Sequence, residues 1–123
     1  MLIGKSLEDY LKTILILKEE IGDVRSVDVA RYMNFSKASV SHAVKLLREK
    51  GLLIVDQEWN LCLTKDGLYH AERILERHTC LTEIFTSLGV DGKIAKQDAC
   101  QIEHIVSNQT FEKVKKAYLD RKD

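Results

Sequence analysis

VARYMNFSKASVSHAVKLL (residues 29–47) has the pattern of two short helices joined by a sharp turn. Ala30 is small, which suits a position where two helices of such a motif cross closely. Asn34 follows four residues later at the expected turn, where φ is positive and asparagine is better tolerated than most residues. Val40 and Ala43 come at the spacing that packs the second helix back on the first. The stretch predicts a helix-turn-helix.

Apolar residues recur at helical spacing on both sides of this motif. Helices are expected at about 6–20, 26–33, 36–50, 65–88, 93–106 and 109–120. Between the third and fourth, the short β-prone runs LLIVD (52–56) and NLCLT (60–64) predict a hairpin. The order predicts a mostly α fold, with a winged helix-turn-helix domain over residues 1–64 and a helical domain over residues 65–123.

The composition limits where the protein works and what it contacts. The 123 residues include 19 basic and 19 acidic side chains, so the formal charge is zero and total charge alone does not indicate a nucleic-acid partner. The longest apolar run near the N-terminus, ILIL (14–17), is shorter than the roughly 7–15 residues of a signal peptide or the about 20 of a membrane span. We expect a cytoplasmic protein with no membrane partner, in which the three cysteines stay reduced.

The outer face of the second motif helix has the side chains of a DNA reader. Hydroxyls and donors that suit phosphates and base edges are expected at Ser36, Lys37, Ser39, Ser41, His42 and Lys45. Four basic residues against one acidic residue give residues 36–51 a net charge of +3. A generic helical hairpin with a solvated face is the alternative, but the small residue, asparagine turn and following hairpin favour double-stranded DNA. The wing tip carries Asp56 and Glu58, which should repel phosphate, so no strong DNA contact is expected there.

DACQIEHIVS (98–107) places a thiol, a carboxylate and an imidazole at Cys100, Glu103 and His104. Residues at i, i+3 and i+4 are neighbours on a helix, and these three donors together suit a divalent transition metal. One helix rarely completes such a site, and Asp9 and His78 are candidates for a further ligand. From the residues alone, packing of a small buried cysteine beside a solvated Glu-His pair is favoured over a metal site.

The chain as a whole resembles the diphtheria toxin repressor family of metal-dependent transcriptional repressors, which includes a manganese transport regulator branch. The resemblance spans nearly the full chain and is carried by EDYLKTI (8–14), the helix-turn-helix, LTKDG (63–67), ERH (76–78) and DACQIEHIVS. It implies a homodimeric repressor of metal homeostasis, activated by a divalent metal that bridges its DNA-binding and its metal-binding and dimerisation domains. Because the chain ends at residue 123, the short form without an SH3-like domain is expected.

The resemblance also implies the ligands, which match Asp9, His78, Cys100, Glu103 and His104. Asp9 is typical of the manganese branch and Cys100 of the iron branch, while Lys12 stands where the manganese branch has a further glutamate. A lysine there disfavours a two-metal cluster, so we expect one site formed by Asp9, Cys100, Glu103 and His104, with His78 a secondary ligand or an outer partner. Thiolate favours Fe2+, Co2+ or Zn2+ over Mn2+, and cellular availability favours Fe2+.

Three other functions are compatible with parts of the sequence. The main alternative is a winged-helix regulator without metal, which senses a small molecule or the oxidation of Cys100. An adaptor that binds a protein partner through Trp59 on the wing is a second. A metalloenzyme is a third, but the chain has no H-E-x-x-H motif, glycine-rich phosphate loop or nucleophile elbow, so we expect no enzyme activity.

Overall fold

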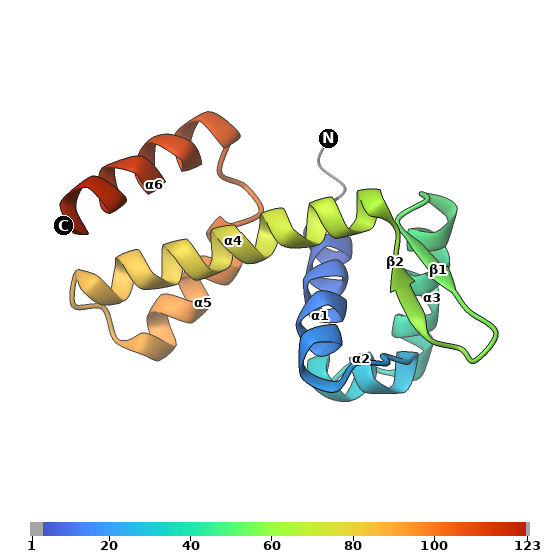
Figure 1. Cartoon of the computed structure of the whole chain (residues 1–123). Helices are drawn as coiled ribbons and strands as arrows, with labels where there is room; N and C mark the ends of the chain where they lie inside the picture. Colours follow the sequence, from blue (N-terminus) through green and yellow to red (C-terminus); the bar gives the residue numbers. More distant parts are fainter. Residues whose placement is uncertain (1–3, 123) are drawn as a thin grey trace. The chain divides into compact units, whose positions relative to one another are not determined.

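The structure, a computed structural model, describes residues 4–122, and these form six helices and one two-stranded antiparallel sheet (Figure 1). The elements in chain order are α1 (Lys5–Ile21), α2 (Ser26–Met33), α3 (Lys37–Glu49), β1 (Leu53–Val55), β2 (Leu61–Leu63), α4 (Lys65–Ser87), α5 (Gly92–Ile102) and α6 (Asn108–Lys122). This order confirms the predicted mostly α fold, a winged helix-turn-helix followed by a helical segment. None of the described helices is both long and apolar enough to cross a bilayer.

The chain divides into two units, Met1–Arg73 and Ile74–Asp123, and the division falls inside α4. The first unit contains α1 to α3 and the hairpin. The second contains the rest of α4 with α5 and α6. The domain boundary expected between residues 64 and 65 stays a prediction.

The helix-turn-helix forms because its turn and its interior are both encoded locally. Asn34 ends α2 in the left-handed conformation, with φ 57° and ψ 44°, as predicted. The backbone N–H of Phe35 then donates to the Ala30 carbonyl at 3.0 Å, which closes the turn. Val40 and Ala43 are buried, so α3 packs on α2 through the two residues whose spacing predicted this contact.

The wing is held by an acidic side chain at its tip. β1 and β2 pair in register from Leu53 opposite Leu63. The Asp56 carboxylate accepts hydrogen bonds from the backbone N–H groups of Glu58 at 2.8 Å and Asn60 at 2.9 Å. These donors, the Asn60 backbone above all, hold the pKa of Asp56 below its ordinary value. Asp56 therefore builds the turn that leaves the Trp59 side chain 75% exposed.

The second unit has a small apolar core and an early helix end. Leu81, Ala99 and Phe111 are its buried cluster, one residue from each of the three helices. The helix expected over 93–106 instead ends at Ile102, so the prediction of its C-terminus was wrong. Glu103 to Ile105 form a turn that leads toward α6.

Gly67 in the first turn of α4 lies against the backbone of the residue before β1. A Cβ atom built there would overlap the Leu52 carbonyl oxygen, which is too close for any side-chain adjustment to relieve. Only glycine lets α4 begin at this distance from Leu52.

We predict that Gly67→Ala lowers the free energy of unfolding by about 1–3 kcal/mol, because the backbone must shift to admit the methyl group. Denaturant unfolding followed by circular dichroism measures the change. Gly92→Ala is the matched control, since Gly92 is also helical and its added Cβ would have no neighbour within 4 Å. Equal stability of Gly67→Ala and the wild type would contradict the close approach of the two backbones.

Candidate metal centre and nucleic-acid interface

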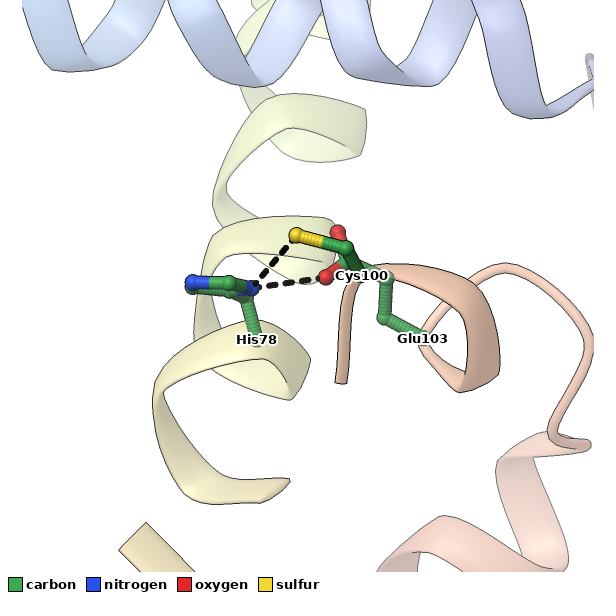
Figure 2. A group of neighbouring side chains, drawn as sticks. All are labelled: His78, Cys100 and Glu103. Carbon is green, nitrogen blue, oxygen red and sulfur yellow. Dashed lines mark hydrogen bonds and ion pairs between the residues drawn. The ribbon is translucent and has the colours of Figure 1, made fainter. Parts of the chain in front are cut away.

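Three donor atoms of the second unit converge on a common point between α4 and α5 (Figure 2). His78 on α4 places Nδ1 2.8 Å from Oε1 of Glu103 and 3.7 Å from Sγ of Cys100 on α5. One ligand atom from each residue lies within 4.8 Å of the other two. The structure therefore brings together an imidazole nitrogen, a thiol sulfur and a carboxylate oxygen.

This set fits a divalent transition metal in chemistry and in size. Metal–nitrogen and metal–oxygen bonds of about 2.0–2.2 Å, with a metal–sulfur bond of about 2.3 Å, put the donors around one ion roughly 3–4 Å apart. Glu103 is fully buried and the His78 side chain is 18% exposed, so the carboxylate is shielded while the imidazole keeps an edge toward solvent. Cys80, two residues after His78 on α4, differs in character, because burial raises the pKa of its thiol and it packs against the apolar core.

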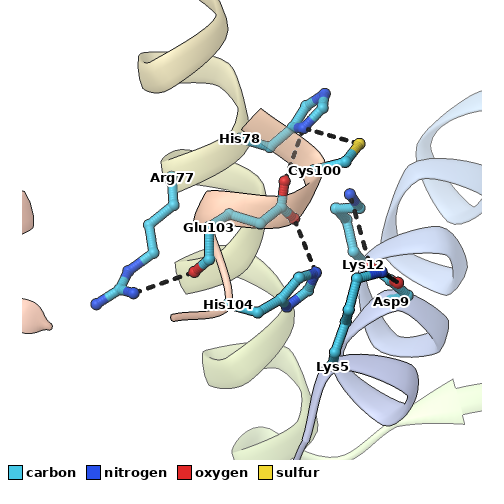
Figure 3. Close-up of polar contacts among 8 residues, drawn as sticks. All are labelled: Lys5, Asp9, Lys12, Arg77, His78, Cys100, Glu103 and His104. Carbon is cyan, nitrogen blue, oxygen red and sulfur yellow. Dashed lines mark hydrogen bonds and ion pairs between the residues drawn. The ribbon is translucent and has the colours of Figure 1, made fainter. Parts of the chain in front are cut away.

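Glu103 lies between two imidazoles (Figure 3). Its Oε1 faces His78, and its Oε2 lies 3.6 Å from Nε2 of His104. The His104 side chain is 2% exposed, so both neighbours meet the carboxylate in a largely dry environment. The predicted triplet does not lie on a single helix. Cys100 belongs to α5, whereas Glu103 and His104 belong to the turn after it.

Asp9, the ligand expected from the first helix, lies on α1 in the other unit. Its Oδ2 accepts a hydrogen bond from Nζ of Lys5 at 3.0 Å, and its Oδ1 lies 3.9 Å from Nζ of Lys12 (Figure 3). The Lys12 side chain is only 11% exposed. The ammonium group of Lys12 thus lies near the Asp9 carboxylate on the same helix. The sequence predicted this positive charge beside Asp9.

The residues expected to contact DNA are all exposed and lie on α3 or directly before it. They are Ser36, Lys37, Ser39, Ser41, His42 and Lys45. Ser36 also has a structural task, because its Oγ accepts the backbone N–H of Ser39 at 3.1 Å and caps α3. The other side chains project from one helix of a helix-turn-helix, which is the geometry that reads a major groove. Their contacts to DNA stay a prediction.

Sequence reasoning missed Arg77, which is 1% exposed although arginine is almost never fully buried unless paired. It lies beside His78 on α4 and donates hydrogen bonds to backbone carbonyls of the turn after α5. Nothing in its local sequence distinguishes it from a solvated helical arginine, so only the tertiary structure identifies it.

Two family models divide the chain between them. One, described as the N-terminal DNA binding domain of iron dependent repressors, matches residues 2–59. The other, described as the metal binding and dimerisation domain of iron dependent repressors, matches residues 64–121. Fold and site thus define a metal-dependent DNA-binding transcriptional regulator. The chain belongs to the iron dependent repressor family, as its motifs predicted.

Individual relatives agree with this assignment. The chain is 30% identical over 115 residues to an uncharacterized HTH-type transcriptional regulator of Methanocaldococcus jannaschii, covering 92% of each chain. It is 33% identical over 106 residues to the transcriptional regulator MntR of Escherichia coli, covering 86% of this chain and 68% of that one. Among solved structures, the manganese regulator SloR superposes with a TM-score of 0.79 at 28% identity, over 93% of this chain and 53% of that one. The chain spans about half the length of that structure.

Proposed function

We propose that the protein represses transcription of metal-homeostasis genes when a divalent metal binds the group formed by His78, Cys100 and Glu103. The observation that carries the proposal is the convergence of these three donor atoms within 4.8 Å, in the part of the chain that matches a metal-binding model. This geometry favours His78 as a direct ligand, whereas the sequence had favoured it as a secondary one. His104, against the second oxygen of Glu103, is a further ligand of the same carboxylate-centred group.

We propose Asp9 as the ligand from the DNA-binding domain on the pattern of the family alone. Lys5 and Lys12 balance its charge within α1, so a metal that recruits Asp9 competes with these ammonium groups for the carboxylate. Lys12 also disfavours a second cation beside Asp9, because like charges in a poorly solvated region repel strongly. This supports one metal per subunit.

Fe2+ is the metal we favour. A thiolate ligand disfavours Mn2+ relative to Fe2+, Co2+ and Zn2+, and Cys100 supplies one where carboxylate would suit manganese. The relatives named for manganese above therefore do not decide the metal for this chain.

In this proposal the protein works in the cytoplasm as a homodimer on double-stranded DNA. A two-fold dimer has to present its two α3 helices about one DNA turn apart, roughly 34 Å, or a multiple of it. Metal that links the DNA-binding and dimerisation domains shifts the population toward the competent spacing. Ser36, Lys37, Ser39, Ser41, His42 and Lys45 then contact DNA.

The proposed function predicts DNA binding that depends on metal and on Cys100. A duplex selected with this protein from a random-sequence pool should be retained with Fe2+, Co2+ or Zn2+ and released by chelator. Cys100→Ala should weaken the response to these metals by about 10-fold or more, because it removes the thiolate ligand. Fluorescence anisotropy against a panel of Fe2+, Mn2+, Co2+ and Zn2+ measures it.

Cys62→Ala is the matched control, since Cys62 is a free thiol on β2 in the first unit and should leave the metal response unchanged. Equal DNA retention with and without chelator would refute metal dependence and favour a regulator that senses another signal.

Coupling between metal and DNA must be reciprocal. Isothermal titration of Co2+ should therefore give a tighter metal Kd in the presence of the selected duplex, by the same factor by which Co2+ tightens DNA binding. A scrambled duplex of equal length and composition should produce little of this effect. Equal metal affinity with and without the selected duplex would exclude the population shift.

Metal affinity should also decrease as the pH is lowered. Imidazole and thiol must lose their protons to bind a metal, so protons compete at His78, Cys100 and His104. Co2+ affinity is expected to drop by more than about 10-fold between roughly pH 8 and pH 5.5. His78→Gln should show a weaker affinity and a shallower pH dependence. A flat wild-type profile would argue against this ligand set.

A further inference from the structure

We propose that Arg77 is a positioning residue for the metal centre, whose guanidinium fixes the turn after α5 so that Glu103 faces His78 and Cys100. The inference rests on the proposed metal-binding function. It assigns to Arg77 no contact with the metal, only control over where the Glu103 carboxylate lies.

Four contacts of Arg77 within the second unit lead to this turn or to the helix that follows it. Nη1 donates to the backbone carbonyls of Glu103 at 3.1 Å and Val106 at 2.6 Å. Nη2 donates to Oδ1 of Asn108, the first residue of α6. The guanidinium carbon lies 5.3 Å from the centre of the Phe111 ring. One buried cation thus joins α4, the ligand-bearing turn and α6.

The turn needs such a donor because α5 ends just before the ligand. The last carbonyls of a helix have no partner within the helix, and a cation near a helix C-terminus is favoured by the helix dipole. After Ile102 the chain tightens, and the N–H groups of Ile105 and Val106 both donate to the Ile102 carbonyl. Arg77 supplies donors to the Glu103 and Val106 carbonyls from another helix.

Arg77 and its neighbour His78 hold the same residue at its two ends (Figure 3). Arg77 donates to the Glu103 main-chain carbonyl, while His78 lies 2.8 Å from the Glu103 carboxylate. Successive residues on a helix point about 100° apart, so α4 reaches the backbone with one side chain and the ligand atom with the next. The position of the carboxylate therefore depends on the backbone anchor as well as on the metal.

Lysine cannot reproduce this anchor. The planar guanidinium has five donors in a fixed fork and reaches three acceptors here, whereas an ammonium group is a single compact charge on a flexible stem. Arg77→Lys should therefore retain the charge but recover only part of the metal affinity.

The test is Co2+ titration of the full chain, followed by the thiolate-to-cobalt charge-transfer band of Cys100. Arg77→Met preserves the apolar stem and removes the donors, and it should weaken Co2+ binding by about 10–100-fold with an altered visible spectrum. Arg77→Lys should give an intermediate affinity. Asn108→Ala, which removes one acceptor of the guanidinium, should cause a smaller loss in the same direction and remains informative if Arg77→Met does not fold.

Leu81→Ala is the matched control, because it weakens the same apolar cluster without touching the carbonyls held by Arg77. It should lower the melting temperature yet leave Co2+ affinity within about twofold and the spectrum unchanged. A wild-type band with full affinity in both Arg77→Met and Asn108→Ala would overturn the role of Arg77 alone, as would an equal loss in Leu81→Ala. A wild-type protein with no thiolate band would overturn the metal site itself, and the role of Arg77 with it.

Discussion

The second unit is organised around a carboxylate that is fully removed from water. A buried, ionised carboxyl group is costly unless hydrogen bonds or cations meet it. Glu103 has an imidazole toward each of its oxygens, from His78 and His104, and the Arg77 guanidinium at its backbone carbonyl. These groups offset the cost of burying a glutamate in the small core of this unit. They also prepare a position that a divalent cation stabilises further.

Charge in the two units is balanced by different means, and this matters for a metal switch. On α1, Asp9 is matched by the ammonium groups of Lys5 and Lys12. Around Glu103 the neighbours are imidazoles, a side-chain type that commonly binds metals. The second unit therefore holds an imidazole, thiol and carboxylate group of the kind that binds a metal, while on α1 the carboxylate of Asp9 is already matched by lysine.

The helix-turn-helix could be predicted from the sequence because its determinants are local. Asn34, Ala30 and Val40 lie within eleven residues, and each acts through the conformation or packing of its neighbours. The end of α5 was not visible in this way, and the carbonyl of Glu103 just after it is met by an arginine 26 residues upstream, a contact that local sequence does not reveal. The donor types of the candidate metal centre were likewise visible in DACQIEHIVS and ERH. Whether His78 is a direct or a secondary ligand was not visible, because the spacing of residues does not say which side-chain atoms face one another.

In the proposed site, selectivity for a metal depends mainly on Cys100. The imidazole and carboxylate of His78 and Glu103 accept most divalent first-row metals, so they set affinity more than choice. A thiolate is the soft member of the set, and the residue that would supply it, Cys100, is half-buried. In the proposed site this sulfur lies 3.7 Å from Nδ1 of His78, so both donors would hold the same ion. The choice of metal would then rest on a sulfur whose partners, His78 and Glu103, belong to α4 and to the turn whose carbonyls Arg77 meets.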